Sequence, residues 1–135
     1  MAKNQVFKYV DTLSLPVPEG TKSGDPVVLN ADTGLVGVAE TDRGPAEGTP
    51  VTADTRYAGG NVNGYASVSL KGAYRLEVTG ALAVLDPVYI TSSGTLTATA
   101  GSNVRFGYSL STKGSGTGPA DVLIDGAPAA AADAG

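Results

Sequence analysis

Apolar and polar side chains alternate with a period of two along residues 66–79. The even positions carry apolar or aromatic side chains at all but one place, and the odd positions are mostly polar. Because successive side chains of a strand point to opposite faces, this pattern predicts a half-buried β-strand. The stretch is longer than a usual strand, and Gly72 interrupts the apolar series. We therefore expect either a strand pair or one strand bent at Gly72.

Two other segments are typical of β-hairpins. In the first, Asp25 and Pro26 open a short apolar run, a turn rich in Asn, Asp and Gly follows at residues 30–34, and apolar residues return at 35–39. Such turn residues tolerate left-handed backbone or cap their own turns. The second segment begins at Asp86 and repeats this start at a constant offset of 61 residues. The repetition indicates either an internal duplication or two solutions to one turn problem.

Further strands are expected in the C-terminal half. Residues 96–100 and 104–110 alternate between apolar and polar side chains and are joined by a turn at 101–103. Residues 122–124 form a last short apolar run. The segment between them, residues 111–119, is rich in Gly and Ser, so we expect a flexible loop there.

These patterns together predict an all-β fold with one small β-barrel or tulip-like sandwich domain at residues 16–125. This domain contains a long loop at 40–64, which is dense in Gly, Pro, Thr and Asp. We expect an extended N-terminal arm at 1–15 and a flexible Ala-rich tail at 126–135, where no large side chain is available for burial. Residues 5–10 alternate weakly and fit either an edge strand or an arm that adds to a partner.

The composition predicts a small core. The chain of 135 residues has no Trp, two Phe and one Met, and its 19 Gly and 8 Pro dilute the periodic segments. A domain of this length buries about two-thirds of its unfolded surface, so an independent core is possible. Oligomerisation would add buried area.

Charge and residue types exclude several classes of function. The net charge of −4 and the scattered basic residues argue against a general affinity for nucleic acid. No apolar run is long enough for a membrane span, and the N-terminus lacks the core of a signal peptide, so we expect a soluble protein made in a cytoplasm. Zero Cys excludes disulfides, and zero His and Cys remove the commonest general bases, nucleophiles and metal ligands.

The remaining candidates for chemistry are weak, so we expect no enzyme, no cofactor and no metal site. The Gly-rich loop at 114–118 lacks the Lys-Ser/Thr end of a phosphate-binding loop, and residues 30–34 lack the ligand spacing of a calcium loop. The aspartates fall mostly in predicted turns, where they usually serve as turn formers. The aspartates considered for such chemistry are Asp25, Asp32, Asp42, Asp54, Asp86, Asp121 and Asp125.

The order of short motifs along the chain is more informative than any one of them. It runs MAKN, an extended segment, SGDPVV, GLVGVA, LKGAYRLEV, DPVY, RFGY and VLI. In this order, over about residues 2–125, the chain resembles small capsid decoration proteins of tailed phages. The resemblance implies a mostly β domain that sits as a homotrimer on the outer surface of the virion. There it would bind neighbouring major capsid protein subunits and reinforce the shell, with neither nucleic acid nor membrane as a partner.

The resemblance also implies which residues make contacts. The N-terminal arm would lie along the capsid, which assigns capsid binding to Lys3, Asn4, Gln5, Val6, Phe7, Lys8 and Tyr9. Arg and Tyr are enriched in interface hot spots, so Arg56, Tyr57 and Tyr65 are candidates for an oligomer interface. An alternative function is a receptor- or carbohydrate-binding module of a phage particle, for which only the six Tyr could stack on sugars. A third is an internal assembly or tail protein.

Overall fold

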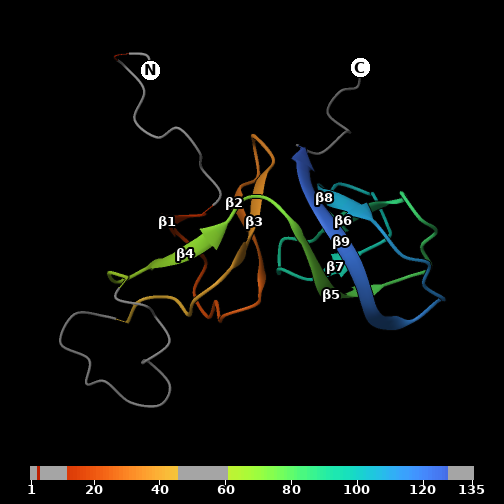
Figure 1. The fold of residues 1–135 in the computed structure, drawn as a ribbon, viewed down its shortest axis with the longest axis horizontal. Coiled ribbons are helices and arrows are strands. Elements are labelled where there is room, and N and C mark those ends of the chain that lie inside the picture. Colours follow the sequence, from red (N-terminus) through yellow and green to blue (C-terminus); the bar gives the residue numbers. More distant parts are fainter. Residues whose placement is uncertain (1–2, 4–11, 46–60, 128–135) are drawn as a thin grey trace.

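The computed structural model describes residue 3, residues 12–45 and residues 61–127. Within these residues the chain folds into β-strands and no helix, which confirms the all-β prediction. The strands are β1 Thr12–Pro16, β2 Pro26–Asn30, β3 Leu35–Ala39, β4 Tyr65–Ser69, β5 Ala73–Thr79, β6 Pro87–Ile90, β7 Leu96–Thr97, β8 Val104–Ser109 and β9 Thr117–Ala127. They form a four-stranded sheet and a closed barrel that lie next to each other (Figure 1).

The N-terminal sheet is antiparallel and has the strand order β1-β4-β3-β2. Its alternating strands place apolar side chains on one face, where Val17, Val27, Ala66 and Val68 are buried. Leu15, Leu29 and Leu70 pack against this cluster but remain partly exposed. The sheet therefore has a core of its own that is incompletely covered.

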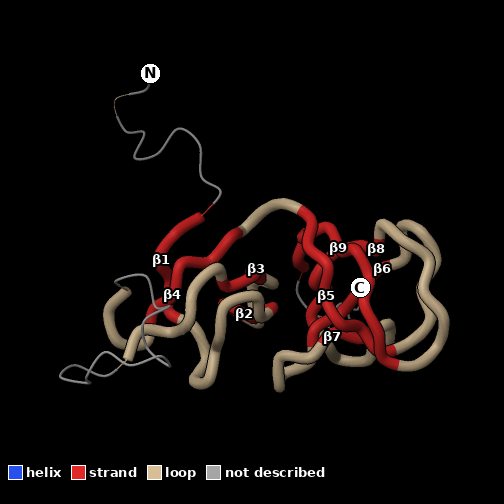
Figure 2. The backbone as a smooth tube through the Cα atoms, turned by 60° about the horizontal axis from the view of Figure 1, so that its bottom comes forward, coloured by secondary structure: helices blue, strands red, loops and turns tan. Residues whose placement is uncertain are grey.

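The barrel has the strand order β5-β7-β6-β8-β9 and closes where β9 pairs with β5. β7 pairs with β6 in antiparallel fashion and with β5 in parallel fashion, so this short strand joins the two edges (Figure 2). The largest side chain in the fully buried core is Phe106. The buried residues of this core are Val36, Val38, Leu76, Val78, Leu82, Val88, Ile90, Leu96, Val104, Phe106, Ala120 and Val122.

Two of these core residues, Val36 and Val38, come from β3 of the N-terminal sheet. They lie on the face of β3 opposite to the first cluster, because successive side chains alternate. A Cβ atom built on Gly126 would meet Val36 Cγ2 at 2.8 Å, which shows how closely the end of β9 approaches β3. Barrel and sheet are therefore packed together through one continuous apolar contact.

The prediction for residues 66–79 is confirmed as a pair of strands. β4 and β5 are separated by residues 70–72, and Gly72 has a φ of 108°, a conformation that favours glycine. Ala66, Val68, Leu76 and Val78 are buried as the alternation requires. The two strands belong to different sheets, so the break at Gly72 is the passage from sheet to barrel.

Both predicted hairpins are present, and the similarity between them extends far beyond the hairpins. β1, β2, β3 and β4 have the same order and directions as β5, β6, β8 and β9. The register also agrees except near the β-bulges, which fall between Val28 and Asn30 on β2 and between Val88 and Tyr89 on β6. Three corresponding couples show the agreement. These are Leu13–Val68 with Tyr74–Val122, Val27–Gly37 with Val88–Gly107, and Val38–Ser69 with Tyr108–Leu123. We call the two sets of four strands the first and second repeat.

The turns before β2 and β6 repeat in atomic detail. Asp25 Oδ2 accepts a hydrogen bond from the Lys22 amide at 3.0 Å, and Asp86 Oδ2 accepts one from the Ala83 amide at 2.9 Å. The residue that precedes the aspartate has a positive φ in both turns: it is Gly24, with φ 92°, in the first turn and Leu85, with φ 75°, in the second. Leu85 thus adopts a left-handed backbone that costs an L-residue about 1–2 kcal/mol.

The repeats differ in the connection between their second and third strands. A short turn at residues 31–34 joins β2 to β3, whereas residues 91–103 join β6 to β8 and contain β7. Only the second repeat has such an added strand among the described residues, and only the second repeat closes into a barrel. The first repeat is therefore an open counterpart of the second.

Two strand predictions were wrong in extent. The last strand was expected at residues 122–124 but runs over Thr117–Ala127, so the end of the expected flexible loop is paired with β5. Long-range pairing with a complete neighbouring strand overrides the low strand propensity of Gly118 and Pro119. The strand expected at 96–100 is limited to Leu96–Thr97, because the Cα partners on β5 end at Thr79.

Candidate interaction surfaces

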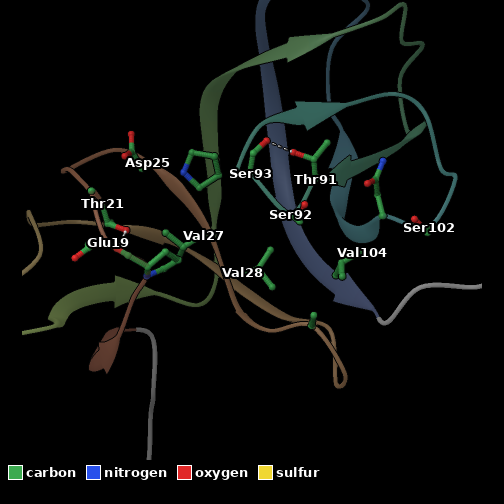
Figure 3. A pocket seen from close by; sticks show the side chains of 16 residues that line it. Glu19, Thr21, Asp25, Val27, Val28, Thr91, Ser92, Ser93, Ser102 and Val104 are labelled. Carbon is green, nitrogen blue, oxygen red and sulfur yellow. Dashed lines mark hydrogen bonds between the residues drawn. The ribbon is translucent and has the colours of Figure 1, made fainter.

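A groove of about 650 Å³ separates β2 of the N-terminal sheet from two loops of the barrel. Residues 18–21 and 25–28 form one wall, and residues 91–94 and 102–104 form the other. Figure 3 shows the hydroxyl side chains of Thr91, Ser92 and Ser93 opposite Val27 and Val28. The groove thus combines apolar side chains on one wall with hydroxyl groups on the other, and these hydroxyl groups can donate or accept hydrogen bonds.

The charged side chains that line this groove are both acidic, Glu19 and Asp25. Glu19 is exposed, and Asp25 Oδ2 is engaged with the Lys22 amide. The ammonium group of Lys22 lies 3.8 Å from Asp42 Oδ2, so its charge is already paired with another carboxylate. One end of the groove is therefore negative and attracts a cationic group.

A second candidate surface is an apolar patch on the second repeat formed by Val84, Leu85 and Leu110. Leu85 is 67% exposed, Val84 is 54% exposed and Leu110 is 42% exposed. Exposed apolar side chains that are grouped in this way are typical of interaction sites. The Leu85 amide donates to the carbonyl of Ser109 at 2.7 Å, so Leu110 follows directly beside it. In the first repeat the corresponding residues are polar or small, namely Ser23, Gly24 and Glu40.

Among the predicted oligomer residues, Tyr65 is the one that the structure describes. It begins β4, is 38% exposed and lies opposite Pro16 of β1. Its amide donates to the carbonyl of Val62, another exposed apolar residue. Tyr65 and Val62 are thus two exposed apolar residues in one turn at the start of β4. Arg56 and Tyr57 lie outside the described residues.

The predicted capsid-binding arm falls almost wholly outside the described residues. Lys3 is in an exposed turn, and Asn4, Gln5, Val6, Phe7, Lys8 and Tyr9 are not described. From Thr12 onward the expected arm region belongs to β1, which pairs with β4.

The connection between β8 and β9 is held by one lysine. Lys113 Nζ donates hydrogen bonds to the carbonyl oxygens of Gly80 at 3.0 Å and Gly114 at 2.8 Å, and also to that of Gly116. In the first repeat Arg43 Nε donates to the carbonyl of Val17 at 3.1 Å, a related contact to the end of the first strand. Cations therefore fix the corresponding loop in both repeats.

An exposed ion pair joins the barrel strands β5 and β9. Arg75 Nε lies 3.0 Å from Asp121 Oδ1 and donates a hydrogen bond to it. This hydrogen bond, together with the negative charge of Asp121, raises the pKa of the Arg75 guanidinium. Arg75 therefore remains a cation throughout the physiological pH range.

The described residues contain neither a cluster of metal-ligating side chains nor a membrane-spanning helix. Where the chain is described, no group of three or more carboxylates is arranged to hold a metal ion. Asn30 Oδ1 accepts hydrogen bonds from the amides of Asp32 and Thr33, so the 30–34 segment uses its polar side chain to form the turn. In the described part of the chain no helix is long and apolar enough to cross a membrane.

Sequence reasoning missed both the groove and the apolar patch. The groove joins segments about 70 residues apart, and no local pattern brings them together. The patch could have been detected in the sequence, since the 61-residue offset aligns Leu85 with Gly24 and Val84 with Ser23. A change from small or polar to large and apolar in an otherwise matching turn marks a surface with a different role.

The fold and its surfaces define a class: a β-structural protein with an acidic groove and exposed apolar patches, suited to contacts with other macromolecules. A family model described as phage cement protein matches residues 8–125. The chain therefore belongs to the phage cement protein family, as the motif order predicted. Its role is that of a structural capsid cement or decoration protein, and its location is the capsid of the virion. A search of curated proteins finds no match to the chain.

Proposed function

We propose that this protein binds the outer surface of a phage head and holds neighbouring major capsid protein subunits together. The observation that carries the proposal is the match to phage cement proteins over residues 8–125. A protein of this role needs several separate contact surfaces. The groove and the Val84–Leu85–Leu110 patch lie on different parts of the molecule and meet that need.

A homotrimer is the assembly that we propose for this role. Once one subunit of a trimer has bound, the others bind at an effective concentration that reaches the millimolar range for short flexible links. Contacts that are individually weak then give stable attachment. Tyr65, with Arg56 and Tyr57, is the proposed subunit interface, and Tyr65 is exposed as an interface residue of a monomer must be.

The N-terminal arm is the second proposed contact with the capsid. It carries Lys3 and Lys8 together with Phe7 and Tyr9, so it combines positive charge with aromatic side chains. Such a segment complements an acidic or apolar surface on the shell.

Binding to heads tests the proposal directly. Purified protein is mixed with expanded heads that lack decoration, and bound protein is measured after sedimentation. We expect saturable binding and release of the packaged DNA at a higher temperature, because the added contacts bridge subunits. Deletion of residues 2–10 should weaken attachment at least tenfold and leave the circular dichroism spectrum unchanged.

Two results would contradict the proposal. If the full chain shows no saturable binding to heads, the proposal that it acts as a cement protein on the outer surface is wrong. If the shortened chain fails to fold, residues 2–10 are part of the fold and not a separate arm. Sedimentation equilibrium of the free protein gives the mass of the assembly, and a stable monomer at all concentrations would exclude the preformed trimer.

A further inference from the structure

The groove beside β2 occupies the place in the first repeat that β7 fills in the second. β7 lies between β5 and β6, and its Thr97 has Thr79 and Tyr89 as Cα partners on either side. At the 61-residue offset these partners correspond to Pro18 and Val28. Both Pro18 and Val28 line the groove. The groove is thus the vacant equivalent of a strand position.

Burial of the neighbouring side chains agrees with this correspondence. Ile90, the Cα partner of Leu96 on β7, is 1% exposed. Its equivalent in the first repeat, Leu29, is only partly buried, whereas Val17 and Val78, the pair at the other side of the strand position, are both buried. The smaller burial of Leu29 agrees with the absence of an added strand beside β2 among the described residues.

The edge of β2 is free to pair in the same way as β6. Within the described residues β2 has a strand partner on one side only, namely β3. An unpaired strand edge presents amide and carbonyl groups that accept another strand. Binding of an extended segment to such an edge gains main-chain hydrogen bonds, and the adjacent side-chain positions provide specificity.

The geometry points to a short extended segment of the major capsid protein as the occupant, added antiparallel to β2 in the position of β7. This inference rests on the proposed function. The segment carries an aliphatic residue where β7 has Leu96, facing Leu29 and Val17. It carries a lysine or arginine toward Glu19, because the groove is lined by two carboxylates and by no basic residue.

The absence of cysteine from the chain allows a clean test. Ser92→Cys places a thiol on the groove wall, and Ser115→Cys places one on the exposed β8–β9 loop; both replacements are nearly isosteric. Each variant is labelled with benzophenone maleimide, bound to undecorated heads and irradiated. We expect the label at position 92 either to crosslink to the major capsid protein within one extended segment or to block attachment at least tenfold. The label at position 115 should leave attachment unchanged.

Charge reversal gives an independent measurement. Glu19→Lys should weaken attachment about tenfold at low salt, with a smaller effect at high salt, because the interaction is electrostatic and exposed. Glu77→Lys, an exposed change on the barrel, is the control and should have little effect. Thermal unfolding of each free variant confirms that the fold is retained.

The outcomes separate the two proposals. If the unmodified protein does not bind heads, the proposed function fails. If it binds, but the label at position 92 neither blocks attachment nor crosslinks to the capsid protein, the inference alone fails. Crosslinking of position 92 to a second copy of this chain would also overturn it, since the groove would then be an interface between copies. If Glu19→Lys binds heads with unchanged affinity, the bound segment does not place a lysine or arginine beside Glu19.

Discussion

Single glycines determine how closely neighbouring strands approach in both repeats. A Cβ atom on Gly107 would lie within bonding distance of the carbonyl oxygen of Leu123 on β9, and one on Gly37 would lie 2.5 Å from Val68 Cγ1 on β4. The two glycines are equivalent in the repeats and are partners of Val88 and Val27. From the sequence, Gly107 was simply an alternating position of a strand. The need for a missing side chain is visible only when the opposite strand is in place.

Gly107→Ala is therefore expected to destabilise the barrel. The added methyl group must displace the backbone of β9, and overpacking of this kind costs about 1–3 kcal/mol or more in the free energy of unfolding. Urea denaturation followed by circular dichroism measures the change. Gly114→Ala is the matched control, because a Cβ atom there has no neighbour within 4 Å. Equal denaturation midpoints for the two variants would show that β9 accommodates the added methyl group without loss of stability.

Among the elements, the β8–β9 connection shows how an apparently flexible segment becomes ordered. Its composition of Gly and Ser predicted flexibility, but Lys113 binds three carbonyl oxygens and fixes the start of β9. A lysine in a loop is usually solvated, so its sequence carries no sign of these contacts. The carbonyl of Gly80, at the end of β5, is brought near only by closure of the barrel.

Lys113→Met is expected to loosen this connection while keeping the length of the side chain. Loss of charged hydrogen bonds to carbonyl groups should lower the free energy of unfolding by about 1–2 kcal/mol, discounted for partial exposure. Amide hydrogen exchange should accelerate at Gly80, whose amide donates to the Gly116 carbonyl at 2.9 Å, and at Thr117. Lys71→Met, in the exposed turn between β4 and β5, is the control. The same exchange rates in both variants would mean that strand pairing alone orders the loop.

The sequence predicted local elements well and long-range features poorly. β4, β5 and the first hairpin follow from alternation and turn residues, which act within a few positions. β7 was predicted too long, over residues 96–100, because the alternation continues beyond Thr97, whereas the pairing with its parallel partner β5 ends at Thr79. The groove was missed because Pro18 and Ser92 meet only after sheet and barrel pack together.

At the scale of the whole molecule, sheet and barrel are joined through β3. Val36 and Val38 complete the barrel core, and residues 70–72 form the direct connection between the two parts. Because one part buries side chains of the other, neither is expected to unfold alone. A single cooperative transition follows from this arrangement.

Val38→Ala tests this coupling. Val38 is 2% exposed, and removal of its two methyl groups should lower the free energy of unfolding by about 2 kcal/mol. We expect one calorimetric transition, shifted as a whole to lower temperature. Val84→Ala, at a 54% exposed site, should change the free energy by less than about 0.5 kcal/mol. Separate transitions for the sheet and the barrel would contradict the coupling.

The shared strand order of the two repeats has a consequence for folding kinetics. A chain with two equivalent strand sets can pair β1 with β9, or β5 with β4, and internal repeats are known to misassemble in this way. The ion pair between Arg75 and Asp121 marks the native partners, because their equivalents Ser14 and Ser67 carry no charge. An exposed ion pair contributes little to equilibrium stability. We expect it instead to favour pairing of β9 with β5 over pairing with the equivalent strand β1 during folding.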